Sequence, residues 1–338
     1  MKTFTCTRRG LLAAGAALPL VGILSRPGQA AEFNYKLATG QDPTHPINLR
    51  AKQAIDRIRE VSKGRLEIKL FPANQLGSDT DLLSQVRNGG VEFFNLSTSI
   101  LATLVPAAGI PNVGFAFEDY GAVWGAMDGA LGDYIRTQIA KSGIVAVCKM
   151  QDNGFRQITS STRPIEKPED LKGFKIRVPP APILTSLFSA LGAGPTPINF
   201  SELYSALQTK IVEGQENPLA IIATTRLYEV QKYCSVTSHV WDGYWILGNR
   251  RAWQNLPEDL RQIATQEFDK SALEEREDIA KLSQSLRQDL TTKGVQFNDV
   301  DRVAFRDVLR KSSFYKDWHG KFGDEAWKLL EGTSGSLA

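Results

Sequence analysis

The sequence predicts an α/β protein built from two domains. Its 338 residues are more than one hydrophobic core usually holds. Residues 33–96 follow the order strand, helix, strand, helix, strand, which is typical of a parallel sheet. A helical pattern of about 36 residues, from Pro257 to Thr292, would be about 54 Å long. A helix of this length exceeds one small domain, so we expect it to span both.

Apolar spacing places the individual elements. Alternating apolar residues predict strands, and a repeat of three to four residues predicts helices. The expected strands are 33–38, 66–71, 91–96, 144–150 and 175–178, and the expected helical stretches are 48–62, 79–88, 120–141, 183–191 and 303–330. Ligands of parallel sheets bind beyond the carboxyl ends of the strands. The loops at these ends, and therefore the candidate ligand contacts, are 39–42, 75–79 and 97–99.

The middle of the chain contains two expected crossings between the domains. Asn153-Gly154 interrupts the strand pattern, and a new strand begins at Phe155. A later strand is expected to end near His239, and the aromatic cluster from Trp241 to Trp245 then marks the return crossing. Crossings in such linker positions define the domain boundaries. The expected division is 31–153 with about 243–282 as domain one, 154–242 with about 283–330 as domain two, and 331–338 as a flexible tail.

The first thirty residues are typical of an export signal. Arg8 and Arg9 precede an apolar run of about fifteen residues, which is shorter than the roughly twenty that span a membrane. Small residues end the segment and predict cleavage between Ala30 and Ala31, so we expect a periplasmic protein without membrane insertion. The arginine pair resembles a twin-arginine signal, although an ordinary secretory signal can also contain two arginines. The segment holds four basic residues and no acid, so the rest of the chain has a net charge of −1 rather than +3, which does not favour nucleic acid as a partner.

Neither the motifs nor the cysteines indicate catalysis. The sequence contains no CxxC, HExxH, GxSxG, GxGxxG or GxxxxGK pattern. The three histidines (His45, His239 and His319) lie far apart, without the spacing of metal ligands. Cys148 and Cys234 lie in apolar alternating segments and are expected to be separate buried thiols, although an oxidising compartment would permit a disulfide. We therefore expect no enzyme activity, no cofactor and no metal site.

Arg177 is the sharpest candidate for a ligand contact. It lies in a short apolar strand, where a charge is costly unless it is paired. A guanidinium offers a planar fork of donors that matches a carboxylate. From the sequence alone, this carboxylate belongs equally well to a ligand or to an internal Asp or Glu. Arg156 is a similar, weaker candidate. Asn217 precedes a proline, so its backbone is expected to be extended at an element boundary.

Several segments together resemble the substrate-binding proteins of TRAP (tripartite ATP-independent periplasmic) transporters. The similarity covers essentially the whole chain after the export signal. The segments that carry it are Phe71 to Gly77, Gly154 to Gln157, Asp170 to Pro179, Pro195 to Pro197 and Val212 to Pro218. The resemblance implies a two-domain periplasmic binding protein fold with a central ligand cleft, crossover strands and a long helix that spans both domains. It also implies delivery of an organic acid to a membrane permease that is commonly driven by sodium.

The resemblance assigns roles to individual residues. It implies that Arg177 grips the ligand carboxylate, that Arg156 supports this contact and that Asn217 contacts the same end of the ligand. The further positions that it places in the pocket are Asp79, Ala181, Tyr244 and Phe200, the last matching an aromatic that packs against the ligand in the sialic-acid-binding members.

The sequence departs from those sialic-acid-binding members around the rest of the pocket. Gly40 stands where they carry an asparagine, and Ser97 stands where they carry a glutamate. Tyr244 replaces a polar amide, and Trp241 and Trp245 add bulk nearby, although the local pattern favours core packing for all three aromatic residues. These changes remove groups that hold a polyhydroxylated chain. The resemblance therefore implies a different acid, namely a uronate, a 2-oxo or 2-hydroxy acid, or an aromatic carboxylate.

Two other functions remain open at the level of sequence. One is a periplasmic protein that presents a ligand to a signalling receptor without any link to transport. The other is an exported enzyme on the same fold. A neighbouring pair of permease genes would favour transport, and turnover of a bound acid would favour an enzyme.

Overall fold

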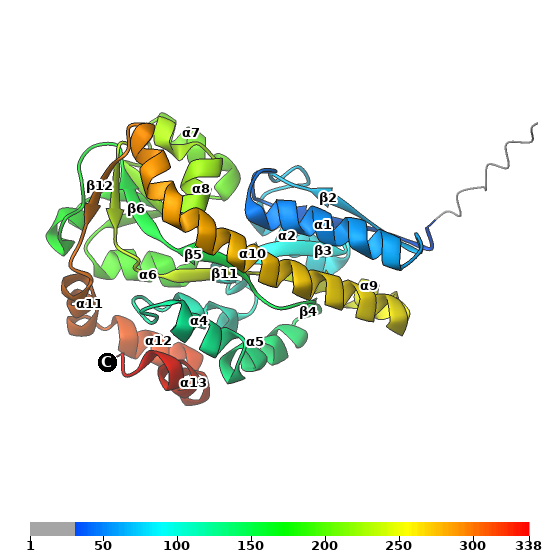
Figure 1. Ribbon diagram of the computed structural model, residues 1–338. Helices are drawn as coiled ribbons and strands as arrows, with labels where there is room; N and C mark the ends of the chain where they lie inside the picture. The colour runs from blue at the N-terminus through cyan, green and yellow to red at the C-terminus, as the bar shows by residue number, and fades with distance from the viewer. Residues whose placement is uncertain (1–30, 338) are drawn as a thin grey trace, which may run out of the picture. The chain divides into compact units, whose positions relative to one another are not determined.

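The computed structural model describes residues 31–337, so the expected export signal at residues 1–30 lies outside the described residues. The described chain forms two six-stranded sheets together with helices that pack on them (Figure 1). The predicted α/β class is confirmed.

The first sheet has the strand order β2-β1-β3-β11-β4, and β5 also pairs with β11. Its strands are β1 (Phe33–Thr39), β2 (Leu66–Phe71), β3 (Phe93–Ser97), β4 (Ile144–Ala146), β5 (Gln151–Phe155) and β11 (Trp241–Asn249). β1 is parallel to both β2 and β3, as the strand-helix-strand order predicts. β11 enters this sheet antiparallel to β3.

The second sheet has the strand order β12-β10-β6-β9-β7-β8. Its strands are β6 (Gln157–Ser160), β7 (Lys175–Val178), β8 (Gly194–Pro197), β9 (Gly214–Asn217), β10 (Tyr233–Val236) and β12 (Gln296–Asp299). β7 is parallel to β8 and β9, so its carboxyl end and that of β9 meet at one edge of the sheet. Arg177 and Asn217 lie at this edge.

The chain passes from the first sheet to the second between β5 and β6, where Arg156 is the single residue between the two strands. It returns between β10 and β11 through residues 237–240. Both crossings lie close to the expected positions, but their details differ. Asn153-Gly154 does not break a strand and instead lies inside β5, because Gly154 adopts a φ of 108° that a glycine tolerates. The aromatic cluster begins β11 and does not precede it.

The helices follow the predicted order, but the stretches predicted at 120–141 and 303–330 are divided into two and three helices. They are α1 (Pro46–Val61), α2 (Asp79–Asn88), α3 (Thr98–Leu101), α4 (Tyr120–Met127), α5 (Ala130–Ala140), α6 (Pro182–Ala190), α7 (Leu203–Gln208), α8 (Leu219–Thr224), α9 (Arg250–Asn255), α10 (Glu258–Thr292), α11 (Arg302–Lys311), α12 (Phe314–Phe322) and α13 (Asp324–Ser334). Short 3₁₀ helices are η1 (Pro106–Asn112), η2 (Pro168–Leu171), η3 (Phe200–Glu202) and η4 (Leu227–Glu229). The helix predicted at 120–141 is divided between Met127 and Ala130 because Gly129 leaves helical backbone with a ψ of −155°. No helix among the described residues is long and apolar enough to cross a membrane.

The longest helix, α10, is confirmed over 35 residues. Glu258 and Asp259 lie in its first turn, where negative charge is stabilised by the helix dipole. The helix contacts α1 and β5 of the first sheet's half and α8 and β12 of the second (Figure 1). It therefore connects elements of both sheets, as its length predicted.

The C-terminal segment is more firmly attached than expected. α13 extends to Ser334 and packs against α4 and α5. Leu337, in the segment expected to be a tail, is fully buried, and its backbone N–H donates to Glu331 Oε1. The structure thus differs from a flexible tail at 331–337, because an apolar side chain near the end of the chain gains a buried site. Cys148 and Cys234 are both free and buried, which confirms the expected separate thiols.

Two carboxyl groups are buried where α10 passes β5. Asp152 and Glu275 are 1% and 0% exposed, and the backbone N–H of Asp152 donates to Glu275 Oε2 at 2.9 Å. Glu275 Oε1 has no hydrogen-bond partner within residues 31–337. Burial raises the pKa of Asp152 to about 7 and the pKa of Glu275 well above its usual value. Both groups therefore take up protons in the folded chain that the unfolded chain releases.

The wild-type chain is expected to lose stability as the pH rises, because Glu275 must then ionise in a buried site. Glu275→Gln should lose less stability over the same range. An acid with a raised folded pKa contributes its full stability below its unfolded pKa and loses it as the pH rises toward the folded pKa. One such group costs about 1.4 kcal/mol per pH unit within that window. As the pH rises above the unfolded value near 4.5, the melting temperature of the variant should therefore increase relative to that of the wild type by about 2 °C per pH unit.

Other titrating groups also change the stability in this pH range, but they contribute equally to the variant and the wild type, so their effects cancel in the difference between the two. Burial lowers the pKa of His45 to about 4 and also lowers the pKa of His239, so these two groups raise stability as the pH increases toward their unfolded values. Thermal unfolding of both proteins across the pH range measures the difference. A constant difference in melting temperature would contradict the assignment to Glu275.

Candidate functional site

A small cavity is lined by residues from both sheets and from the helices beside them. Its water-accessible volume is ≈ 20 Å³, about the room of one water molecule. The cavity brings together seven of the residues predicted from sequence, namely Asp79, Ser97, Arg156, Arg177, Phe200, Asn217 and Tyr244. The remaining residues of its wall are Ser99, Ile100, Pro179, Ile221 and Asp242.

Arg177 reaches this cavity from β7. The side chain is 1% exposed, and its Nε and Nη2 atoms donate to the backbone oxygen of Ile198 at 2.9 and 2.6 Å. Within residues 31–337 no carboxylate lies within 4.0 Å of its nitrogens, so the internal ion pair that the sequence left open does not form. Burial lowers the pKa of Arg177 to about 10, although Glu216 acts in the opposite direction. Arg177 is thus a buried cation that lacks a partner of opposite charge in direct contact.

Arg156, in contrast, is fully engaged by neighbouring carboxylates. Its Nε atom lies 2.5 Å from Glu216 Oε2, and its Nη1 atom lies 3.1 Å from Asp242 Oδ2. Burial alone would lower the pKa of Arg156, but the charge of Glu216 raises it above its usual range. His239 Nε2 lies 3.1 Å from the same Glu216 oxygen. Because Arg156 lies between β5 and β6, this network ties the first crossing to β9 and β11.

Asn217 belongs to the same network. Its Oδ1 atom accepts a hydrogen bond from Arg156 Nη2 at 3.1 Å, and its Nδ2 atom donates to Gln215 Oε1. It ends β9 in extended backbone, as its position before a proline predicted. The amide is therefore held in a fixed orientation at the edge of the cavity.

Asp242 is a member of the site that sequence reasoning missed. It is fully buried in β11 and accepts hydrogen bonds from five side chains. These are Ser97, Thr98, Asn112, Asn153 and Arg156. The available signal was a carboxylate inside an otherwise aromatic and apolar strand, where an ionised group requires several partners. Ser97 lines the cavity, and its hydroxyl donates to Asp242.

Asp79 enters the cavity from the first turn of α2. It is 6% exposed, and its Oδ1 atom accepts a hydrogen bond from Asn74 Nδ2 at 2.9 Å. Burial raises the pKa of the Asp79 carboxyl, while the Asn74 hydrogen bond and the charge of Arg177 act against this shift. Tyr244 lies on the same wall, and its hydroxyl oxygen accepts a hydrogen bond from Gln41 Nε2 at 2.6 Å.

Three predicted site residues do not line this cavity. Gly40 lines a neighbouring pocket of ≈ 230 Å³ together with Phe200, which is therefore shared by both spaces. Ala181 is buried in front of α6. Trp241 packs edge-on against Phe117, and its Nε1 atom donates to Asp152. The sequence pattern favoured core packing for this tryptophan, and the structure places it in the core.

Gly40→Asn is expected to disturb Asp79. A Cβ atom at position 40 would lie 2.6 Å from Asp79 Oδ1, so the carboxyl would have to move. Forcing extra atoms into a packed site costs about 1–3 kcal/mol. The matched control is Gly125→Ala in α4, where a Cβ meets nothing within 4 Å, and this change should leave stability equal or higher. Chemical unfolding compares the two variants, and equal stabilities would contradict the expected clash.

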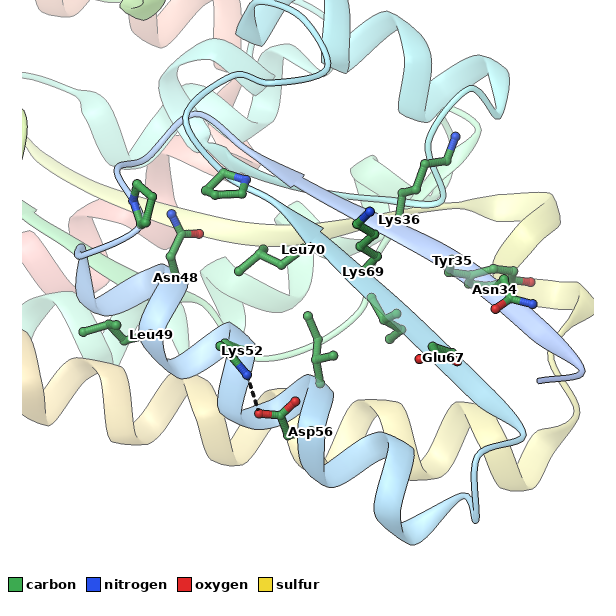
Figure 2. Close-up of a pocket in the computed structure, with 14 residues that line it drawn as sticks. Asn34, Tyr35, Lys36, Asn48, Leu49, Lys52, Asp56, Glu67, Lys69 and Leu70 are labelled. Carbon is green, nitrogen blue, oxygen red and sulfur yellow. Dashed lines mark hydrogen bonds and ion pairs between the residues drawn. The ribbon is translucent and has the colours of Figure 1, made fainter. Parts of the chain in front are cut away.

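A larger pocket lies elsewhere, over α1, β1 and β2 (Figure 2). Its volume is ≈ 760 Å³, and none of the predicted site residues lines it. The ion pair between Lys52 and Asp56 at its edge is 2.8 Å long, and both side chains are mostly exposed. Exposed pairs of this kind contribute little and need no ligand to balance them. Within residues 31–337 no group of three or more His, Cys, Asp or Glu side chains is arranged to hold a metal ion.

Comparison with known proteins relates most of the described chain to one family. The model of the bacterial extracellular solute-binding proteins, family 7, matches residues 37–317. The 2,3-diketo-L-gulonate-binding periplasmic protein of Escherichia coli (strain K12) is 30% identical over 306 residues, which are 89% of this chain and 92% of that protein.

Solved structures of TRAP periplasmic solute-binding proteins share the fold. One from Ralstonia eutropha H16, with bound (S)-2-acetolactate, has a TM-score of 0.85 and 29% identity and covers 89% of this chain and 98% of its own. One from Sulfurospirillum deleyianum DSM 6946, with bound succinate, has a TM-score of 0.85 and 26% identity and covers 90% of this chain and 99% of its own. The family match spans well over half of the sequence, and the chain therefore belongs to the bacterial extracellular solute-binding proteins of family 7.

Proposed function

We propose that this protein binds the carboxylate of an organic acid at Arg177 and delivers the acid to the membrane permease of a TRAP transporter. The observation that carries this function is the buried guanidinium of Arg177, which has no carboxylate in contact within residues 31–337. The relatives support the choice of ligand, because the ligand named for one of them and the molecules bound in the solved structures are organic acids. Delivery to a permease rests on membership of the family.

The hydrogen bonds of Arg177 leave donors for a ligand. A guanidinium carries five N–H groups, and Nε and Nη2 each give one to the backbone oxygen of Ile198. Nη1 and the second N–H of Nη2 remain to form a bidentate pair with a carboxylate. Arg156 binds the carboxylates of Glu216 and Asp242, and Asn217 binds Arg156 and Gln215, so we assign both residues to positioning this end of the cavity.

The cavity has to widen for an acid to enter, because its water-accessible volume of ≈ 20 Å³ is far below that of a ligand pocket. We propose that the two sheets belong to two domains, residues 31–153 with about 243–282 and residues 154–242 with about 283–330. These domains move apart about the two crossings and close on the ligand. The contact of α13 with α4 and α5 attaches the last helix to the first domain as well.

Cleavage between Ala30 and Ala31, with release on the outer side of the cytoplasmic membrane, completes the proposed function. No catalytic step is part of it. Prolonged incubation should return a bound acid unchanged, and its conversion to another compound would favour an exported enzyme instead.

A thermal-shift screen against organic acids tests the function. A ligand at 100 times its dissociation constant stabilises the folded state by about 2.7 kcal/mol, which is a clear rise in melting temperature. The screen includes uronates, 2-oxo acids, 2-hydroxy acids, aromatic carboxylates and the corresponding primary amides. Stabilisation by at least one acid and not by its amide is expected. Failure of every acid to stabilise the protein would contradict the proposed function.

A further inference from the structure

The charges around the cavity are paired unequally. Arg156 forms ion pairs with two carboxylates, Glu216 and Asp242, so its positive charge is already balanced within the protein. Arg177 remains as the one lining cation within residues 31–337 that has no carboxylate in contact. The cavity therefore offers a single position for one carboxylate, and a second carboxylate of the same ligand would find no unpaired cation there.

Asp79 adds a negative group to the same wall. It lines the cavity with Arg177, but the two do not form an ion pair within 4.0 Å. Its only hydrogen bond among the described residues comes from Asn74 to Oδ1, while a carboxylate can accept about four. The first turn of α2, which stabilises negative charge, holds it in place. Asp79 is thus an acceptor with unused capacity in a space that a ligand would share.

The surroundings of Asp79 are closely packed. Gly40 lies beside Oδ1, where even a Cβ atom at position 40 would come within 2.6 Å. The side chain of Asn74 lies on the same side and is itself fixed by a hydrogen bond to the backbone oxygen of Gly77 at 3.1 Å. Asn74 therefore anchors one oxygen of a carboxylate that lines the cavity.

We infer that Asp79 is a specificity-determining residue that accepts a hydrogen bond from a ligand hydroxyl and excludes a second carboxylate. The ligand class is then a hydroxylated monocarboxylic acid and not a dicarboxylic acid. This inference rests on the proposed function, since it assumes that Arg177 holds the first carboxylate. It also distinguishes this chain from the related protein that was solved with bound succinate.

A matched set of four-carbon acids tests this selection by calorimetry. Erythronate carries a terminal CH₂OH group, tartrate replaces that group with a second carboxylate, and butanoate has no hydroxyl. The same series at six carbons is gluconate, glucarate and hexanoate, which allows for a longer cavity when the domains open. The wild-type protein should bind the hydroxylated monocarboxylate of at least one series about tenfold or more tightly than both of its counterparts, because an unpaired carboxylate and a lost hydrogen bond are each penalised.

Asp79→Asn provides the second arm. The amide keeps the shape of the side chain and removes its charge, so the preference for monocarboxylate over dicarboxylate should shrink by about tenfold or more. Asp79→Ser is a smaller neutral replacement in case the asparagine disturbs the fold. Asp56→Asn, on the exposed face of α1, is the control and should leave the preference unchanged.

The outcomes separate this inference from the proposed function. If the wild-type protein binds a dicarboxylate as tightly as its hydroxylated partner, or if both Asp79 variants keep the wild-type preference, the role of Asp79 is overturned while carboxylate binding stands. If no acid of either series binds and the wider acid screen is also negative, the proposed function itself is overturned, and the inference with it.

Discussion

Replacing Arg177 with alanine is expected to weaken the binding of an organic acid by about 2–5 kcal/mol. The guanidinium is 1% exposed and therefore already desolvated. A ligand carboxylate then forms a strong electrostatic interaction with it, and no further water has to be removed from the guanidinium. Without it, the ligand carboxylate would be buried beside Asp79 with no cation in contact. Calorimetry with the acid found by screening measures the loss.

Arg177→Lys separates charge from geometry at the same position. Lysine retains the positive charge but lacks the planar fork that holds Ile198 O and a carboxylate together. We expect most of the loss in affinity to remain. Arg59→Ala is the control, since this arginine is largely exposed on α1 and should not affect binding. Unchanged affinity in Arg177→Ala would rule out Arg177 as the carboxylate contact.

Replacing Glu216 with alanine is expected to destabilise the fold by about 3–5 kcal/mol. Glu216 is fully buried and contacts both Arg156 and His239, so its removal leaves a buried guanidinium whose one remaining ion-pair partner among residues 31–337 is Asp242. Burial alone would raise the pKa of Glu216, but the charge of Arg156 lowers it to about 2. A depressed folded pKa contributes stability above the unfolded value, near pH 4.5, which is lost as the pH falls toward 2.

Glu267→Ala is the matched control for this loss. Glu267 forms an ion pair with Arg57 at 2.5 Å, but both side chains are partly exposed. Exposed pairs contribute about 0–1 kcal/mol, so this variant should stay close to the wild type in chemical unfolding. A loss in Glu216→Ala no greater than that in Glu267→Ala would contradict a stabilising role for the buried network.

The parts of the fold that follow local patterns could be predicted from the sequence. β7 spans the residues that the alternating run around Arg177 indicated, and α10 ends at the predicted Thr292. In both cases the apolar residues repeat with the period of a single element, and capping or proline signals mark its end. Arg177 could be singled out for the same reason, because a charge in an apolar strand is a local signal, whereas its place in a ligand pocket was implied only by the resemblance to the family.

The remaining features depend on contacts between distant residues. Gly154 looked like a break, yet it continues β5 because β11 supplies a pairing partner from nearly ninety residues later in the chain. The partners of Asp242 could not be identified from its own segment, because its hydrogen-bond donors lie at five positions between Ser97 and Arg156. Whether Arg177 is paired with an internal carboxylate was likewise open until the positions of Glu216 and Asp79 were known.

The most direct measurement of the central role of Arg177 compares one acid with its own primary amide by calorimetry on the wild-type protein. The two ligands have nearly the same shape, and only the acid can form a bidentate, charge-assisted pair with the guanidinium. We expect the acid to bind and the amide to bind at least about a hundredfold more weakly, which corresponds to about 2.7 kcal/mol. Equal affinities would contradict carboxylate recognition by Arg177.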